Sequence, residues 1–325
     1  MSSISNLWTQ TFPPAPRFTD LECQDLTGKV FIITGGTGGI GLELAQILYR
    51  KNGKVCITGR SSSVDKAAKI ISEVKAKYTA STGELWFLSL DLNDLTTIKT
   101  SAEQFLVRAS RLDVLWNNAG VMIPPSGSKT AQGHELQLGV HCLGHFLFTQ
   151  LLSPILIKTA QISQPCTVRI IWLSSLAIER YAPTGGLVLD TLGHEEGLSQ
   201  WVNYAQSKVG CYFLSVEMAS RMRDRGVINL CANPGNVQTS IQRYVPKLQM
   251  MLLWKAVYGS YTELYAGLSP DITLQHSGRY IVPFGRLGVV RDDIQAQTQI
   301  SGHGNATLSN KFLVWCEQQT EQFMS

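Results

Sequence analysis

The chain lacks the features that mark disulfide-stabilised and nucleic-acid-binding proteins. Its seven cysteines are dispersed and none forms a C-x-x-C pair. An odd, dispersed set of this kind indicates free thiols in a reducing compartment. The 28 Lys and Arg and the 24 Asp and Glu give a net charge of +4, with no block of like charge. This scatter argues against nucleic-acid binding as the main function.

The chain also has little that indicates a membrane or secreted protein. Its longest apolar stretch, 146–157, is interrupted by three polar residues and a proline, and it is too short to span a bilayer. Residues 1–20 have neither a basic start nor a long apolar segment, so we expect no signal peptide. We therefore expect a cytoplasmic protein without a membrane span.

What the sequence does contain is a regular alternation of apolar runs and amphipathic segments. The expected strands are 29–34, 54–58, 85–90, 112–116, 168–173, 227–231 and 280–282. The expected helices are 39–51, 64–78, 95–108, 134–152, 204–224 and 308–319. This order predicts an α/β protein with a single-domain Rossmann fold, a doubly wound parallel sheet of about seven strands.

Three parts of the chain are expected. Residues 1–27, which contain Pro13, Pro14 and Pro16, predict an extended N-terminal arm. Residues 28–290 form the dinucleotide-binding and catalytic domain, with a lid around 236–260. Residues 291–325 form a C-terminal extension whose helix carries an apolar face for packing.

A glycine-rich turn follows the first expected strand and precedes a helix. Its spacing is G-x-x-x-G-x-G, and the residues that we expect to contact a cofactor are Gly35, Thr37, Gly39, Ile40 and Gly41. Without side chains, the backbone can approach a pyrophosphate and present N–H groups beside the positive end of the helix. Taken alone, the pattern is also that of a tight strand–helix connection.

Polar residues follow the next two expected strands. Arg60 follows the second strand, where an arginine accommodates the 2′-phosphate of NADP; the alternative is a solvated surface arginine. Asp91 and Leu92 end the third strand, where a carboxylate could accept a hydrogen bond from the adenine amino group. The alternative for Asp91 is the N-cap of the following helix.

Two further turns are candidates for the cofactor crevice. One contains Asn118, Ala119 and Gly120, and the other contains Pro234, Gly235, Val237 and Thr239. Small residues and amides at the carboxyl end of strands suit a crevice in an open sheet, although plain turns use the same residues. After the second turn, the segment around 236–260 predicts a mobile cover over nicotinamide and substrate, with a surface loop as the alternative.

Three side chains are candidates for acid–base chemistry. Ser175 follows the fifth expected strand, and Tyr204 and Lys208 lie four residues apart at the start of a helix. That spacing puts the phenol and the ammonium on one face. An adjacent ammonium favours the phenolate form, which acid–base work near neutrality requires. The same pair also occurs on ordinary surface helices.

Most of these residues directly follow an expected strand, in chain order, and so fall on one edge of one sheet. The chain thereby resembles the short-chain dehydrogenase/reductase family over about residues 27–290. The matching segments are the turn 34–41, Asp91, 117–120, Ser175, Tyr204-x-x-x-Lys208 and Pro234-Gly235. The run 143–149 and the Ser-Ser-Leu-Ala sequence at 174–177 are most similar to the retinol-dehydrogenase-like branch, to which many fungal secondary-metabolite reductases belong.

The resemblance implies an NADP-dependent enzyme that interconverts a ketone or aldehyde and an alcohol on a small to medium apolar substrate. Tyr204 is then the general acid in reduction and the base in oxidation. Lys208 favours the phenolate and holds the nicotinamide ribose, and Ser175 orients the substrate oxygen. The resemblance also implies a homo-oligomer formed through the two long helices, which the N-terminal arm and the C-terminal helix could block.

One position departs from the family. The family usually has Asn in an Asn-x-x-Gly context that supports a water relay to the lysine, whereas this chain has His141, followed by Gly144. We expect His141 to sustain the relay, by holding the water or by carrying protons itself. The alternatives are non-redox chemistry on the same fold and cofactor (a cyclase, dehydratase or isomerase) and a non-catalytic dinucleotide-sensing protein. The set of Ser175, Tyr204 and Lys208 argues against the second alternative.

Three histidines share one helix face. His141 and His145 have a spacing that could bind zinc, and His134 lies on the same face. No Cys or carboxylate completes a ligand set at a clear spacing. We therefore expect these histidines to pack in the interior or against another subunit, and we expect no metal.

Overall fold

The architecture comes from a computed structural model, which describes all residues except 1–2, 193–197, 240–241, 243–252, 300–305 and 325. Within these described residues, eight strands form one sheet in the order β3-β2-β1-β4-β5-β6-β7-β8. Their bounds are β1 Val30–Ile33, β2 Lys54–Gly59, β3 Glu84–Ser89, β4 Val114–Asn117, β5 Arg169–Leu173, β6 Ile228–Ala232, β7 Tyr280–Val282 and β8 Arg286–Gly288. The expected doubly wound α/β sheet is confirmed, and β8 is an additional strand that pairs antiparallel with β7.

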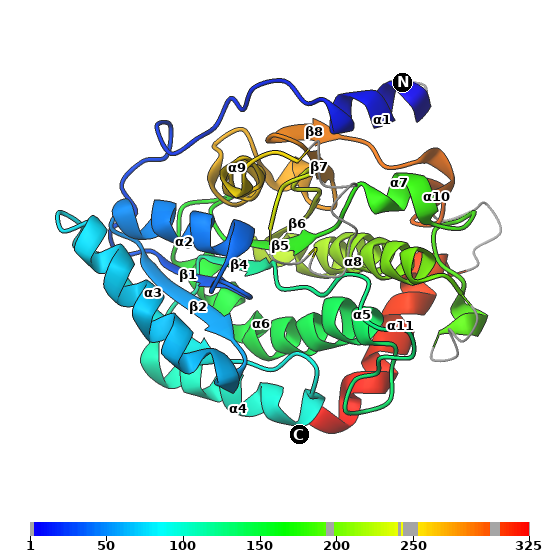
Figure 1. The fold of residues 1–325 in the computed structure, drawn as a ribbon, viewed down its shortest axis with the longest axis horizontal. Coiled ribbons are helices and arrows are strands. Elements are labelled where there is room, and N and C mark those ends of the chain that lie inside the picture. Colours follow the sequence, from blue (N-terminus) through cyan, green and yellow to red (C-terminus); the bar gives the residue numbers. More distant parts are fainter. Residues whose placement is uncertain (1–2, 193–197, 240–241, 243–252, 300–305, 325) are drawn as a thin grey trace.

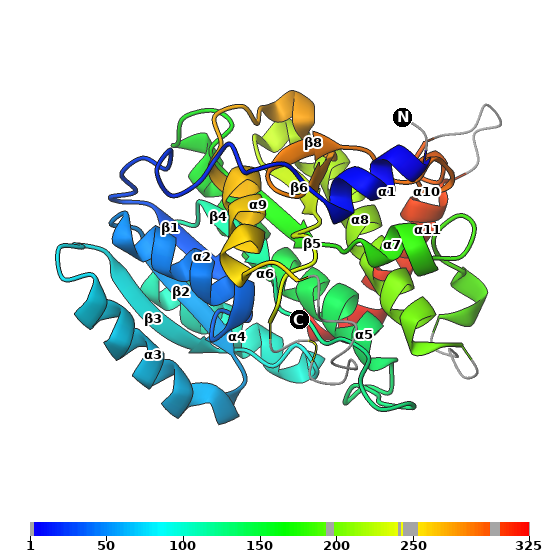
Figure 2. The same ribbon diagram turned by 45° about the horizontal axis from the view of Figure 1, so that its top comes forward.

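Helices cover both faces of the sheet (Figures 1 and 2). Their bounds are α1 Ser3–Thr11, α2 Gly39–Arg50, α3 Val64–Lys77, α4 Leu95–Arg108, α5 Leu136–Leu138, α6 His145–Gln161, α7 Ala177–Tyr181, α8 Gln200–Met222, α9 Ala256–Leu268, α10 Asp292–Ala296 and α11 Leu308–Thr320. A π-helical segment, Gly139–Gly144, joins α5 to α6.

The strands explain why two cores form. Successive side chains of a strand point to opposite faces. In β1, Val30 and Ile32 therefore join the core under α4, α6, α8 and α11, whereas Phe31 and Ile33 join the core under α2 and α9. Because both faces are covered, β1 is apolar at every position, which is why it appears in the sequence as a continuous apolar run.

Two segments differ from expectation. The N-terminal arm is not wholly extended, because its first part forms the helix α1, which ends just before Pro13 and Pro14. The end of the expected lid is not a cover: from Ala256 onward it belongs to α9, which packs beside α2 on the sheet (Figure 2). Within that lid, 240–241 and 243–252 lie outside the described residues.

One helical stretch of the described chain, Leu136–Gln161, is long and apolar enough by length and composition to cross a membrane. Thr149 and Pro154, which interrupt the apolar run in the sequence, both lie inside α6 and do not end the helix. Within its most apolar window, 72% of the stretch is buried in the protein. The stretch is therefore packed as the core helix of an α/β domain.

Candidate active site

A cavity of about 1190 Å³ follows the carboxyl ends of β1 to β6. It brings together nearly all of the residues that the sequence singled out, from the loops after β1 to β6 and from the helices α2 and α8. Those that line it are Gly35, Thr37, Gly39, Ile40, Arg60, Asp91, Leu92, Asn118, Ala119, Gly120, Ser175, Tyr204, Lys208, Pro234, Gly235, Val237 and Thr239. Gly41 and His141 do not line it.

The glycine-rich turn forms one end of the cavity. Gly35 and Gly39 adopt φ values of +68° and +57°, which side chains disfavour. Gly38 supplies no side-chain cap to α2, so the first N–H groups of that helix have no side-chain partner from its N-cap. Gly41 serves packing instead, because a Cβ there would lie 2.6 Å from Asn118 Nδ2. This end of the cavity is therefore suited to an anionic group.

Two cations lie at the far end of the turn. Arg60 lines the cavity directly after β2, and Lys66, from the first turn of α3, lines it too. A Cβ on Gly38 would lie 3.6 Å from Lys66 Nζ, which places the ammonium over the glycine-rich turn. Lys66 was not among the residues predicted from the sequence, although its position six residues after Arg60, at the start of a helix, was a usable signal.

The proposed alternative role of Asp91 as a helix cap is wrong. The N-cap of α4 is Asp94, whose side chain accepts a hydrogen bond from Thr96 N. Asp91 Oδ1 instead accepts a hydrogen bond from Asn93 N at 3.0 Å, while the residue lines the cavity. The carboxylate is thus held by its own turn and remains beside the cavity.

The acid–base candidates lie where β5 meets α8. Tyr204 and Lys208 are one helical turn apart and both are buried. Lys208 Nζ donates a hydrogen bond to Leu173 O at 3.0 Å and lies 5.8 Å from the centre of the Tyr204 ring. Ser175 follows β5, and its hydroxyl accepts a hydrogen bond from Ala177 N at the start of α7. A phenol, an ammonium and a hydroxyl therefore line one stretch of the cavity.

The chain is similar in sequence to known proteins. The profile described as short chain dehydrogenase matches residues 29–186. A short-chain dehydrogenase/reductase of Phomopsis amygdali is 42% identical over 99% of this chain and 98% of its own length. The chain belongs to the short-chain dehydrogenase/reductase family. It is also similar to the short-chain dehydrogenase/reductase bet4 of Neocamarosporium betae, at 39% identity over 99% of this chain and 94% of that protein.

Solved structures share the fold. A putative uncharacterized protein from Mycobacterium paratuberculosis aligns with a TM-score of 0.69 and 24% identity, covering 94% of this chain and 97% of its own. The NADPH-bound carbonyl reductase from chicken fatty liver aligns with a TM-score of 0.59 and 22% identity, covering 78% of this chain and 96% of its own. The fold and the family membership thus agree with the resemblance seen in the sequence.

The position at which this short-chain dehydrogenase/reductase departs from its family is fully buried. His141 Nε2 accepts a hydrogen bond from Val121 N at 3.0 Å. Ser207 Oγ donates to Tyr204 O, so the 2.8 Å contact between His141 Nδ1 and Ser207 Oγ has the imidazole as donor. Burial, with Lys208 and His145 nearby, lowers the pKa of His141 well below 6.5. Both ring nitrogens are thus occupied by protein groups, and this geometry does not support a ring that holds a relay water or carries protons.

The other two histidines of that face also have protein partners. His145 Nδ1 contacts His141 O at 3.2 Å, its Nε2 lies 2.9 Å from Thr34 Oγ1, and burial lowers its pKa to about 3. His134 packs edge-on against Trp315. In the described part of the chain, no group of three His, Cys, Asp or Glu residues could hold a metal ion.

Further residues line the cavity. They are Thr11, Met122, Arg180, Tyr181, Trp201, Gln242 and Leu253, of which Gln242 and Leu253 belong to the segment that was expected to form a lid. The rings of Tyr181 and Trp201 lie 4.9 Å apart. Thr11 comes from α1, far from the sheet in sequence, and no local pattern could have placed it there.

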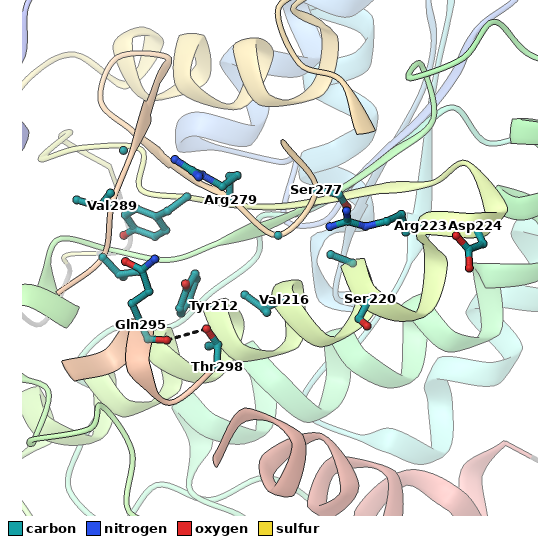
Figure 3. A pocket seen from close by; sticks show the side chains of 15 residues that line it. Tyr212, Val216, Ser220, Arg223, Asp224, Ser277, Arg279, Val289, Gln295 and Thr298 are labelled. Carbon is teal, nitrogen blue, oxygen red and sulfur yellow. Dashed lines mark hydrogen bonds between the residues drawn. The ribbon is translucent and has the colours of Figure 1, made fainter. Parts of the chain in front are cut away.

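A second cavity, of about 370 Å³, lies between α8 and the β7–β8 hairpin (Figure 3). Tyr212, Val216 and Ser220 line it from α8, with Arg279 and Val289 on the opposite side. It is remote from the acid–base residues, because Tyr204 and Tyr212 are eight residues apart, about 12 Å along the helix. None of the predicted site residues lines this cavity.

Proposed function

We propose that the chain is an NADP(H)-dependent oxidoreductase that interconverts a ketone or aldehyde and the corresponding alcohol. One observation carries the proposal: Tyr204, Lys208 and Ser175 line the same cavity as the glycine-rich turn and Arg60. Family membership supports oxidoreduction, and the fold neighbour described as an NADPH-bound carbonyl reductase supports the cofactor.

The residues present fit a nicotinamide dinucleotide. The start of α2 offers backbone N–H groups to a pyrophosphate, and Gly38 leaves room for it. Arg60 and Lys66 provide two cations for a 2′-phosphate, where an acidic residue would instead hold a free ribose hydroxyl. When bound, the cofactor supplies or accepts a hydride at the substrate carbon.

The protein residues handle the oxygen and its proton. In reduction, the Tyr204 hydroxyl gives its proton to the substrate oxygen and becomes the phenolate; in oxidation, the Tyr204 phenolate removes the alcohol proton and becomes the phenol. Ser175 donates a hydrogen bond that orients this oxygen and stabilises its developing charge. The Lys208 ammonium is anchored on Leu173 O and lies 5.8 Å from the centre of the Tyr204 ring, which places a cation beside the phenol.

The lining of the cavity favours an apolar substrate of small to medium size. Tyr181, Trp201, Met122 and Pro124 present ring and aliphatic surfaces beside Tyr204. The similarity to fungal short-chain dehydrogenase/reductases supports a reaction in secondary metabolism. The unpaired cysteines and the buried apolar helix support a cytoplasmic protein.

NADPH oxidation in the presence of a panel of apolar ketones and aldehydes, with product analysis, tests this function. We expect turnover by the wild-type chain and a loss of at least about 100-fold in Tyr204→Phe, because the phenol supplies the proton. NADPH binding should survive this change. Undiminished product formation by Tyr204→Phe would show that the mechanism is wrong, and product formation without NADPH consumption would favour non-redox chemistry.

A further inference from the structure

The N-terminal helix α1 docks onto the loops that form the substrate end of the active site. It lies outside the segment 29–186 that matches the family profile. In both views it lies beside β8 and close to α7 (Figures 1 and 2). Asn6 donates hydrogen bonds to Val289 O and to Glu179 Oε1, Arg180 donates to Thr11 Oγ1, and Arg286 donates to Thr9 O.

Gln10 is the residue of α1 that reaches the interior. Its side chain is 1% exposed, whereas Trp8, two positions earlier, is 64% exposed. Gln10 Nε2 donates to Asn6 Oδ1 at 3.1 Å, and Gln10 Oε1 accepts from Asn233 Nδ2 at 2.8 Å. Both ends of the amide are therefore used, and its orientation is determined.

Asn233 links the Gln10 side chain to the cofactor crevice by hydrogen bonds. It is 1% exposed, directly follows β6, and its Oδ1 accepts a hydrogen bond from Gly235 N at 3.0 Å. Gly235 has a φ of +90° and lines the cavity. A buried amide with one partner removed leaves a donor unsatisfied and can reorient. Gln10 and the turn at Gly235 are thus linked through one buried amide, that of Asn233.

We propose that Gln10 is a positioning residue for the nicotinamide half of the cofactor. The proposal rests on the proposed function. In it, α1 holds the Asn233–Gly235 turn in the conformation that binds the cofactor. The affinity for the adenosine half of the cofactor should not depend on Gln10. Arg60 follows β2, and β2 and β6 are four strand positions apart in the sheet, which is about 19 Å.

The test compares two probes that share the adenosine half. Dissociation constants for NADPH and for adenosine 2′,5′-bisphosphate are measured by titration calorimetry on the wild-type chain, Gln10→Leu, Asn233→Ala, the double variant, and Trp8→Ala as a matched control on the same helix. We expect Gln10→Leu to weaken NADPH binding by about fivefold or more, the size of one lost hydrogen bond, and to leave bisphosphate binding unchanged. The double variant should bind NADPH no more weakly than Asn233→Ala, because both changes break one chain of contacts.

Bisphosphate binding also reports whether each variant has folded. NADPH affinity within twofold of the wild type in Gln10→Leu would overturn the inference, as would equal weakening of both ligands or additive losses in the double variant. Those outcomes leave the proposed function intact. Failure of the wild-type chain itself to bind NADPH would overturn both.

Discussion

His141 shows what a single residue does in this fold. The family pattern marked it as the unusual position beside Lys208, but the sequence could not say which atoms it would contact. The structure gives it two partners, Val121 N and Ser207 Oγ, and a neutral ring. Through Ser207 the ring is linked to the backbone carbonyl of Tyr204, so we assign His141 a positioning role beside the proposed acid–base residue.

Replacing His141 by Asn should be tolerated. An amide also offers a donor and an acceptor, so we expect kcat within about tenfold of the wild type, about 1.4 kcal/mol of barrier. Because its pKa lies well below 6.5, His141 is neutral throughout the neutral range. The kcat–pH profile of wild type and variant should therefore have the same shape between pH 6 and 8. An inflection in this range that only the wild type shows would contradict the assignment and favour a proton relay.

At the scale of elements, α9 is where expectation and structure differ most. Its first turn was expected to belong to a lid, yet it packs beside α2 and against the sheet. Gly259 and Gly267 allow this close approach: a Cβ would lie 3.1 Å from Ile40 on the first and 2.1 Å from Trp116 on the second. Between them, on the same face, lies Glu263, which is fully buried.

Glu263 makes the stability of the protein dependent on pH. Neither of its carboxylate oxygens has a hydrogen-bond partner in the described structure. Burial raises its pKa well above 4.5, although the charge of Lys208 acts in the opposite direction. The folded state therefore keeps a proton that the unfolded chain releases, and stability contributed by this group is lost as the pH rises above about 4.5.

Glu263→Gln should remove this dependence. The hydrogen bond from Trp116 Nε1 goes to the backbone carbonyl of residue 263 and survives the change. We expect the unfolding free energy of the variant, relative to the wild type, to increase between pH 5 and pH 8, as measured by urea denaturation at both pH values. A constant difference between the two proteins would mean that Glu263 does not hold its proton in the folded state.

At the scale of the molecule, the two ends of the chain cover the Rossmann domain on different sides. α1 covers the substrate end, and α11 packs on α8 and on the π-helical segment Gly139–Gly144. Phe312 and Leu313 of α11 are fully buried in the hydrophobic core to which α8 also contributes. At the edge of this contact, Arg221 of α8 forms an ion pair with Glu317 of α11. The surface of α8, one of the two long helices through which the family resemblance implies assembly, is thus covered by α11 of the same chain.

We therefore expect a monomer of 35.8 kDa in light scattering coupled to size exclusion. Removing residues 307–325 should expose the surface of α8 and cause concentration-dependent association, because a contiguous apolar patch favours self-association. A dimeric mass for the full chain would contradict this expectation. A truncated chain that stays monomeric and stable would show that α11 does not protect an interface.

The site could be predicted from the sequence wherever function is carried by residues next to strands. Arg60, Ser175 and Pro234 each follow an apolar run, and parallel strands bring their carboxyl ends to one edge, so their meeting follows from the pattern alone. Thr11 and Gln10 could not be predicted in this way. No sequence periodicity relates α1 to the residues after β6. Their contact depends on the path that the intervening chain takes in the folded structure.

The sequence by itself determined the α/β class, which strand precedes each predicted site residue, and most of the cavity lining. Hydrophobic periodicity and glycine-rich turns are local properties of the chain, so they can be read without the tertiary structure. Only the tertiary structure decided the partners of His141, the burial of Glu263 and the docking of α1 and α11. These depend on side chains from distant segments competing for the same buried space, and hydrogen bonds between such segments leave no trace in the spacing of residues.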